Sequence, residues 1–184
     1  MNLGDPKIAE TAVRHILEYI GEDPNREGLL KTPSRVVRAY GELTEGYRQD
    51  PAKILSTTFS ETCNEMIVVR DINFWSLCEH HLLPFSGKAI VGYLPKDRIV
   101  GLSKIGRIVH CFSRRLQVQE KLTQQIADAI MEHLNPMGVG VIISATHQCM
   151  AMRGIRTPAE MVTSCLLGQF LEPATRAEFL HFKP

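Results

Sequence analysis

Hydrophobic side chains recur at helical spacing in the first part of the chain. Between Asp5 and Gly21 they return every three or four positions, which predicts an amphipathic helix that ends at the glycine. A capping residue followed by proline is typical of a helix start. The chain has this pair at Asp5-Pro6, Thr32-Pro33 and Asp50-Pro51. Residues 1–58 are therefore predicted to be helical.

The pattern changes after about residue 57, where branched and alternating apolar residues predict strands. The predicted strands are Met66–Ile72, Ser86–Leu94, Arg98–Leu102, Gly138–Met150 and Met161–Leu167. The predicted helices of this part are Ser103–Arg114, Gln119–Leu134 and Thr175–Phe182. Residues 1–184 are thus expected to form a single α+β domain, in which residues 59–184 combine antiparallel strands with two central helices.

The bulk composition narrows the class of protein. With 184 residues, 44% hydrophobic and 22% charged, the chain has the composition of one globular domain. Its net charge of +1 argues against non-specific binding to nucleic acid or membranes, and no apolar run approaches the length of a membrane span. No secretory signal is visible, and the five scattered cysteines indicate reduced thiols or metal ligands. We therefore expect a cytoplasmic protein.

Two short clusters of cysteine and histidine carry the strongest chemical signal. In residues 78–81 (Cys-Glu-His-His), one tight turn can direct Cys78 and His81 to a single ion. In residues 147–149 (His-Gln-Cys), the two outer side chains would project from one face of the predicted strand. A catalytic zinc takes three such ligands and a water. The sequence predicts a zinc hydrolase, and its surplus histidines suit proton transfer. Residue types alone leave open which of them are ligands.

A basic helix start is a candidate anion site. Ser103, Lys104 and Arg107 lie in the first turns of a predicted helix, where free backbone N–H groups attract phosphate. Arg153 follows the second cluster and would add positive charge beside the metal. A solvated helix start with ordinary surface charges explains the same pattern. Glu120 is by default a favourable acid in the first turn of its helix.

Several longer segments, taken in order, resemble those of one enzyme family. They are Arg26–Arg35, Ser76–Phe85, Gly101–Lys104 with Arg107, Gln117–Glu120, and His147–Met150 with Arg153-Gly154. On these segments the chain resembles GTP cyclohydrolase I of the zinc-dependent type, and the resemblance runs over nearly its whole length. No departure is found at the positions that matter.

The resemblance implies a fold, an assembly and a reaction. The fold is a tunnelling fold, with a four-stranded antiparallel sheet and two helices on one face, joined with other subunits into a barrel. The assembly is a homodecamer of two pentamers with active sites at subunit interfaces. The reaction converts GTP and water into formate and 7,8-dihydroneopterin triphosphate, the first step of pterin and folate biosynthesis.

The resemblance also assigns roles by position. The ligands of one Zn²⁺ per subunit would be Cys78, His81 and Cys149. The catalytic histidines would be His80 and His147. The substrate-binding residues would be Ser103, Lys104, Arg107, Gln119, Glu120 and Arg153, with Arg35 reaching a neighbour's site. Within that set, Gln119 and Glu120 would hold guanine and the others the triphosphate.

Three other functions stay open on the sequence. A zinc nucleobase deaminase is a weaker match, because its H-x-E and P-C-x-x-C spacings are absent. A structural zinc domain or a non-catalytic ring would have a closed four-ligand site and no turnover. A redox pair of Cys78 and Cys149 would leave the protein without metal. The remaining cysteines and histidines are predicted to be structural, and Trp75 is predicted to lie in the core near the metal loop.

Overall fold

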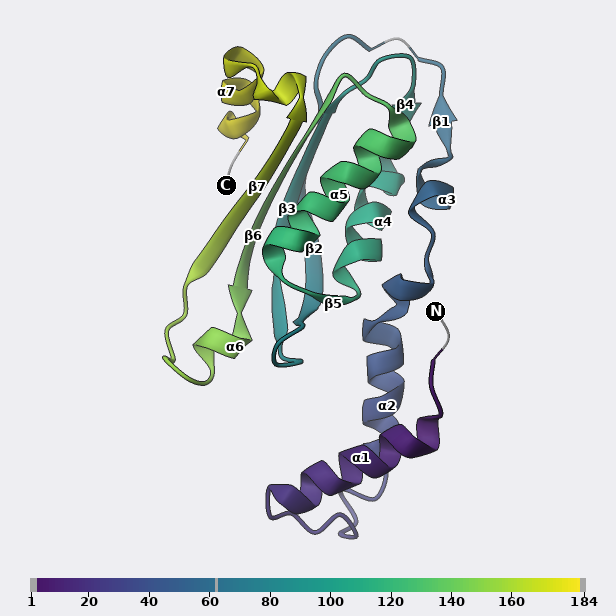
Figure 1. The fold of residues 1–184 in the computed structure, drawn as a ribbon, viewed down its shortest axis with the longest axis vertical. Helices are drawn as coiled ribbons and strands as arrows, with labels where there is room; N and C mark the ends of the chain where they lie inside the picture. The colour runs from purple at the N-terminus through teal and green to yellow at the C-terminus, as the bar shows by residue number, and fades with distance from the viewer. Residues whose placement is uncertain (1–2, 62, 183–184) are drawn as a thin grey trace.

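The computed structural model describes residues 3–61 and 63–182, which form a curved sheet, two helices across one of its faces and a helical pair that extends away from it (Figure 1). The N-terminal elements are α1 (Pro6–Tyr19), α2 (Thr32–Leu43), the 3-10 helix η1 (Glu45–Arg48) and α3 (Pro51–Leu55). The strands are β1 (Thr58–Phe59), β2 (Ile67–Cys78), β3 (Pro84–Leu94), β4 (Ile99–Val100), β5 (Leu116–Gln117), β6 (Gly138–His147) and β7 (Glu160–Gly168). The remaining helices are α4 (Leu102–Ser113), α5 (Gln119–Leu134), α6 (Gln148–Ala151), η2 (Gln169–Leu171) and α7 (Pro173–His181).

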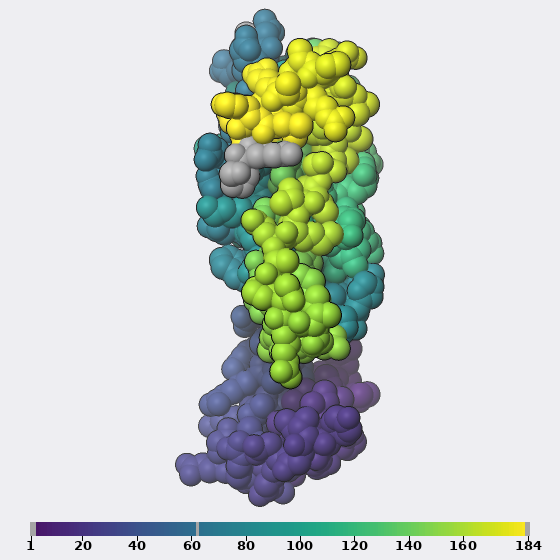
Figure 2. Space-filling view, turned by 90° about the vertical axis from the view of Figure 1, so that its left-hand side faces the viewer, coloured from purple at the N-terminus to yellow at the C-terminus, as the bar shows by residue number. Residues whose placement is uncertain are grey.

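Helices begin at all three predicted places, but Thr32 is not a cap, because it is the first residue of α2 and Lys31 precedes it without a side-chain cap bond. The Asp5 carboxylate accepts a hydrogen bond from the Lys7 N–H at 2.9 Å, and Asp50 accepts one from the Ala52 N–H at 3.0 Å. Such caps satisfy N–H groups that have no partner inside the helix. Helices α1 and α2 contact each other and form the purple lobe at the lower end of Figure 2. No helix within the described residues is long and apolar enough to span a bilayer.

The main sheet has the strand order β5-β2-β3-β6-β7. Its four long strands pair antiparallel with their neighbours, and the short β5 pairs parallel with the end of β2. Helices α4 and α5 lie across one face, as Figure 1 shows. This arrangement confirms the α+β class and contains the four-stranded antiparallel sheet that was expected.

Both faces of the sheet carry apolar cores. Alternate residues of β3 and β6, among them Val91 and Val141, pack against α4 and α5 in the larger core. On the other face, Ile90 and Ile142 form a smaller core with side chains of η2 and α7. Two glycines make that second core possible, since a Cβ at Gly140 would lie 2.5 Å from the Phe170 ring.

Four sequence predictions about this region were wrong in detail. Strand β2 continues past Ile72 to Cys78. The prediction missed this second half, because a bulge with Asp71 at a φ of 59° shifts the register of the strand. Trp75 lies on this unforeseen half and is 60% exposed instead of buried in the core. The strand expected at residues 98–102 covers only β4, since α4 begins at Leu102 with Gly101 as its cap in place of Ser103. Strand β6 ends at His147, where α6 takes over.

Candidate metal centre

Four segments of the chain meet at one end of the sheet. Strand β2 ends where β3 begins, and Phe85 near the start of β3 pairs with His147 at the end of β6. Cys78 at the end of β2 pairs with Gln117 of β5. Backbone pairing therefore brings residues from distant parts of the sequence together at this end.

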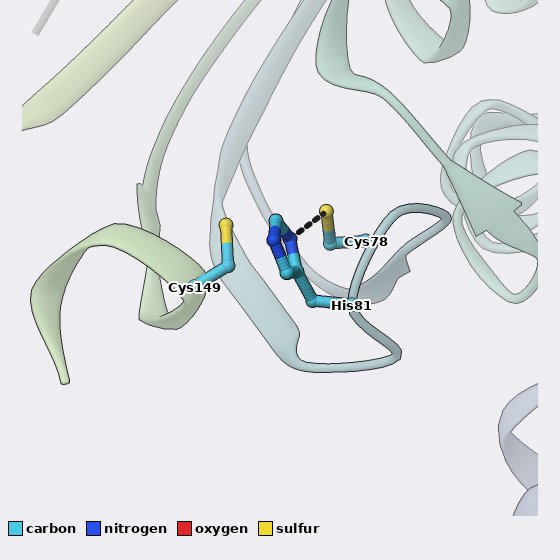
Figure 3. A group of neighbouring side chains, drawn as sticks. All are labelled: Cys78, His81 and Cys149. Atoms are coloured by element: carbon cyan, nitrogen blue, oxygen red, sulfur yellow. Dashed lines mark hydrogen bonds between the residues drawn. The ribbon is translucent and has the colours of Figure 1, made fainter. Parts of the chain in front are cut away.

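Cys78, His81 and Cys149 form a group that could hold a metal ion (Figure 3). Their ligand atoms all lie within 4.8 Å of one another, and the Cys78 Sγ is 3.7 Å from His81 Nδ1. Cys78 is buried, Cys149 is half-buried and His81 is exposed. Two thiols and one imidazole are the donor set that zinc prefers, and three protein ligands leave a position for water or substrate. The residues fit a catalytic zinc better than a closed structural one.

The local backbone explains how these side chains converge. After Cys78 the chain makes a tight turn, with the Leu82 N–H donating to the Cys78 carbonyl at 2.9 Å and the Cys78 N–H to the Leu83 carbonyl at 2.8 Å. This turn carries His81 back toward Cys78. Cys149 comes from α6 and not from a strand, so the expected same-face projection with His147 was the wrong reason for its position. The single turn of α6 directs the Cys149 side chain toward Cys78 and His81.

Electrostatics at Cys149 favour a protonated thiol in the absence of metal. Burial raises the pKa of the Cys149 thiol, and the adjacent Cys78 sulfur raises it further, whereas the charge of Arg153 lowers it. A metal ion would have to displace this proton, so metal binding should weaken as the pH falls.

His147 lies beside the group but is not part of it. Its ring stacks on the Phe85 ring with centroids 4.5 Å apart and planes 7° apart, and its Nε2 lies 2.8 Å from the Gln119 Oε1. Burial lowers the pKa of His147, while the Glu120 charge acts in the opposite direction. Burial thus favours the neutral form of His147, which lies outside the group of candidate ligands.

His80 and Arg153 lie at the rim of the group. His80 is exposed, and its Nδ1 is 4.0 Å from the Cys78 Sγ. The Arg153 Nη1 lies 3.1 Å from His81 Nε2, so a guanidinium stands directly beside the ligands. Glu120 is exposed in the first turn of α5 and close enough to act on the titration of His147.

The other predicted phosphate residues lie elsewhere. They line a cavity of about 1010 Å³ between α3, η1 and α4, and none of the three clustered ligands is among the described residues of its wall. The basic residues of this wall include Arg48, Lys53, Lys104, Arg107 and Arg114, with Ser103 beside them. Helix α4 starts at the opposite end of the sheet from α6, as Figure 1 shows. Arg35 is exposed on α2, outside both places.

Gln119 is the predicted site residue whose surroundings differ most from expectation. Only 1% of it is exposed, and its amide is bonded on both sides to protein groups. Sequence reasoning also missed Phe85, the stacking partner of His147, because nothing in its spacing separates it from an ordinary core residue.

An α+β chain that brings two thiols, an imidazole and a second histidine to the end of its sheet has the organisation of a metal-dependent enzyme. Residues 9–183 match the family described as GTP cyclohydrolase I. The chain belongs to the GTP cyclohydrolase I family.

Several proteins similar to this chain are named GTP cyclohydrolase 1. The chain is 57% identical over 182 residues to GTP cyclohydrolase 1 of Synechococcus sp. (strain JA-2-3B'a(2-13)), covering 97% of this chain and 79% of that protein. It is 56% identical over 174 residues to GTP cyclohydrolase 1 of Leptospira biflexa, covering 93% and 95%. It is 52% identical over 180 residues to GTP cyclohydrolase 1 of Wolinella succinogenes, covering 96% of each. The similarity thus spans the helical pair as well as the sheet.

Proposed function

We propose that the protein converts GTP and water into formate and 7,8-dihydroneopterin triphosphate, the first step of pterin and folate biosynthesis. The observation that carries this proposal is the group of Cys78, His81 and Cys149 beside His147, in a member of the GTP cyclohydrolase I family. The identity of 57% to a protein named GTP cyclohydrolase 1 supports the same reaction.

Zinc is the metal that the donor set supports. Cys78, His81 and Cys149 would hold one ion per subunit, and three protein ligands would leave a position for water or substrate. When bound, zinc supplies an activated water at neutral pH, because it lowers the pKa of that water to about 7.

The chain's own residues would handle the protons of the reaction. Carbon C8 of guanine is a weak electrophile, and protonation of N7 by His80, or by His147 once its Nδ1 has also taken up a proton, makes attack by water easier. General acid–base help of this kind is worth about 10²–10⁴-fold in rate. Cleavage of the C8–N9 bond gives a formamide, a second hydrolysis releases formate, and the opened ribose rearranges and closes onto the freed amine. Glu120 is suited to accept hydrogen bonds from the guanine edge during these steps.

We place the triphosphate between two copies of the chain. Arg153 stands beside the metal group, but Ser103, Lys104 and Arg107 line a cavity at another part of the molecule. In the described part of the chain, β7 has a neighbour on one side only, and β2 is covered on its outer side only by the short β5. Open edges of this kind can pair with strands of another copy. A closed barrel of such copies, and the homodecamer expected for the family, would bring one copy's basic cavity to the next copy's metal.

The decisive experiment is incubation of the zinc-loaded protein with GTP. We expect formate in equal amount to a product that becomes a fluorescent pterin after oxidation. Ammonia in place of formate would indicate a nucleobase deaminase. Full zinc content without any turnover would indicate a structural or scaffolding protein, and purified protein that neither contains nor binds zinc would favour a redox role for the two cysteines.

A further inference from the structure

We infer that Gln119 is a positioning residue that holds His147 in the tautomer with the proton on Nε2, and that it does not contact the guanine. The Nδ1 of His147 is then the atom that exchanges a proton with the substrate. The tautomer follows from the geometry alone, and only its link to turnover rests on the proposed function.

The side chain of Gln119 is fixed by acceptors on two neighbouring strands. Its Nε2 lies 3.0 Å from the carbonyl of Ile143 in β6 and 2.9 Å from the carbonyl of Met161 in β7. A carbonyl oxygen can only accept, so the atom that faces these two carbonyls must be the amide nitrogen. Turning the amide over would place three oxygens against one another. The Oε1 therefore has to face His147.

A third neighbour agrees with this orientation. Thr123 donates its hydroxyl proton to the backbone carbonyl of Gln119 at 2.7 Å, so it has no proton left for the Thr163 hydroxyl 2.6 Å away. Thr163 must therefore donate to Thr123, which leaves the Thr163 oxygen as an acceptor toward the Gln119 Nε2 at 3.1 Å. The Gln119 Nε2 thus faces three acceptors with its two protons, and none of these three neighbours would accept contact with an oxygen instead.

The orientation of Gln119 determines the state of His147. The Oε1 is an acceptor and lies 2.8 Å from Nε2, so Nε2 must carry a proton. In a neutral imidazole the other nitrogen then has a free lone pair. No hydrogen bond to Nδ1 is found within the part of the chain that the structure describes. Stacking on Phe85 holds the ring plane, so Nδ1 has one fixed direction.

This role differs from a contact with guanine in a measurable way. A residue that only binds substrate changes KM, whereas a residue that fixes the proton-transfer group changes kcat. Gln119 is 1% exposed and its polar atoms are all engaged, so a substrate atom would have to break one of these bonds to reach it. Its sequence neighbour Glu120 is exposed and remains available for guanine.

The test combines steady-state kinetics with histidine NMR on the zinc-loaded protein. Gln119→Met, which cannot accept a hydrogen bond in the same way, should lower kcat by about 10²-fold and leave the KM for GTP within about twofold. Gln124→Met is the matched control, because it makes the same change at an exposed glutamine of α5 that bonds Asp128, and it should turn over like the wild type.

The NMR measurement tests the tautomer without any assay of turnover. Protein labelled with ¹⁵N in its histidine rings is compared with a His147→Asn variant to identify the His147 signals. We expect a protonated Nε2 and an unprotonated Nδ1 in the wild type, and a changed pattern in Gln119→Met. A wild-type ring protonated on Nδ1 would overturn the inference, as would a Gln119→Met protein with raised KM and unchanged kcat. A wild type that shows the Nε2–H tautomer but releases no formate would refute only the proposed function.

Discussion

His80 and His81 are consecutive residues whose side chains have different surroundings. The tight turn after Cys78 directs His81 into the metal group, with its Nδ1 3.7 Å from the Cys78 Sγ. His80 is turned by nearly a right angle, with the two ring planes at 83°, and stays exposed at the rim. One neighbour is therefore suited to hold an ion and the other to move a proton.

Replacing each of these histidines should separate the two roles. His80→Ala should keep its zinc and lose turnover by about 10²–10⁴-fold, the usual contribution of an acid–base group. His81→Ala should lose zinc and formate release together. Metal analysis of the purified proteins and a formate assay decide the matter. If His80→Ala loses zinc and His81→Ala keeps it, the two roles are exchanged.

The pH dependence of stability should report on His110, which lies in α4. Burial lowers the pKa of His110, the charge of Arg114 lowers it further and Glu45 opposes them. The unfolded chain therefore binds this proton at a higher pH than the folded chain does, so acid favours unfolding. The free energy of unfolding should fall as the pH drops below about 6.5. Urea titrations at several pH values should show a shallower fall in His110→Gln, and an unchanged slope would contradict the assignment.

Residue types predicted the metal group, but not the contacts that hold the histidine beside it. Cysteine and histidine are chemically distinctive, so the two clusters could be found from the sequence, but only the family resemblance separated the ligands Cys78, His81 and Cys149 from the other histidines. The bonds of Gln119 go to backbone carbonyls of β6 and β7, which become neighbours only when the sheet forms. No local pattern encodes such a contact, and Gln119 looked like a partner of Glu120.

At the level of elements, the sequence predicted helices and strands correctly where the local pattern of residues determines them. Helix α5 begins and ends where its period predicted, at Gln119 and Leu134. Strand β2 was cut short because the bulge at Asp71 exchanges the faces on which its side chains lie. The end of β6 was misplaced because no glycine or proline between Ala145 and Met150 marks the change from strand to helix, and only three-dimensional packing decides where the strand stops.

The contact between η1 and α4 offers a test of packing. Gly46 lies so close to the end of α4 that a Cβ there would collide with the Cys111 carbonyl and lie 2.8 Å from the Arg114 carbonyl. Gly46→Ala should therefore lower the free energy of unfolding by about 1–3 kcal/mol. Gly106→Ala, in α4 with nothing within 4 Å of the new methyl, should raise it by about 0.5–1 kcal/mol. Equal effects of the two changes in urea unfolding would show that the close contact does not exist.

At the scale of the whole molecule, the metal group and the basic cavity are separate surfaces of one chain. If they join across copies, two inactive variants should restore each other. We expect His81→Ala and the double variant Lys104→Ala with Arg107→Ala to release little formate alone. Refolded together in equal amounts, they should recover about a quarter of wild-type activity. Half of the copies have an intact metal group, and about half of these meet a neighbour with an intact basic cavity by chance.

The matched control for this mixing is a pair of variants damaged on the same surface. His81→Ala refolded with His147→Ala should stay inactive, since both changes affect the metal side of the site. No recovery in the first mixture would place the complete site within one copy, and recovery in the control would show that the metal side is itself shared between copies.

The glycine-lined second core also sets an order of events during synthesis. Gly92 and Gly140 receive the rings of Phe170 and Phe179, which come from η2 and α7. A ribosome makes the chain from its N-terminus, so every strand of the sheet exists before either ring has been added. Until then the apolar surface around Ile90 and Ile142 has nothing of its own to cover it. A chain interrupted before η2 would carry its metal ligands and the helices α4 and α5 of the larger core. It would still expose an apolar face that quality-control proteases and chaperones can recognise.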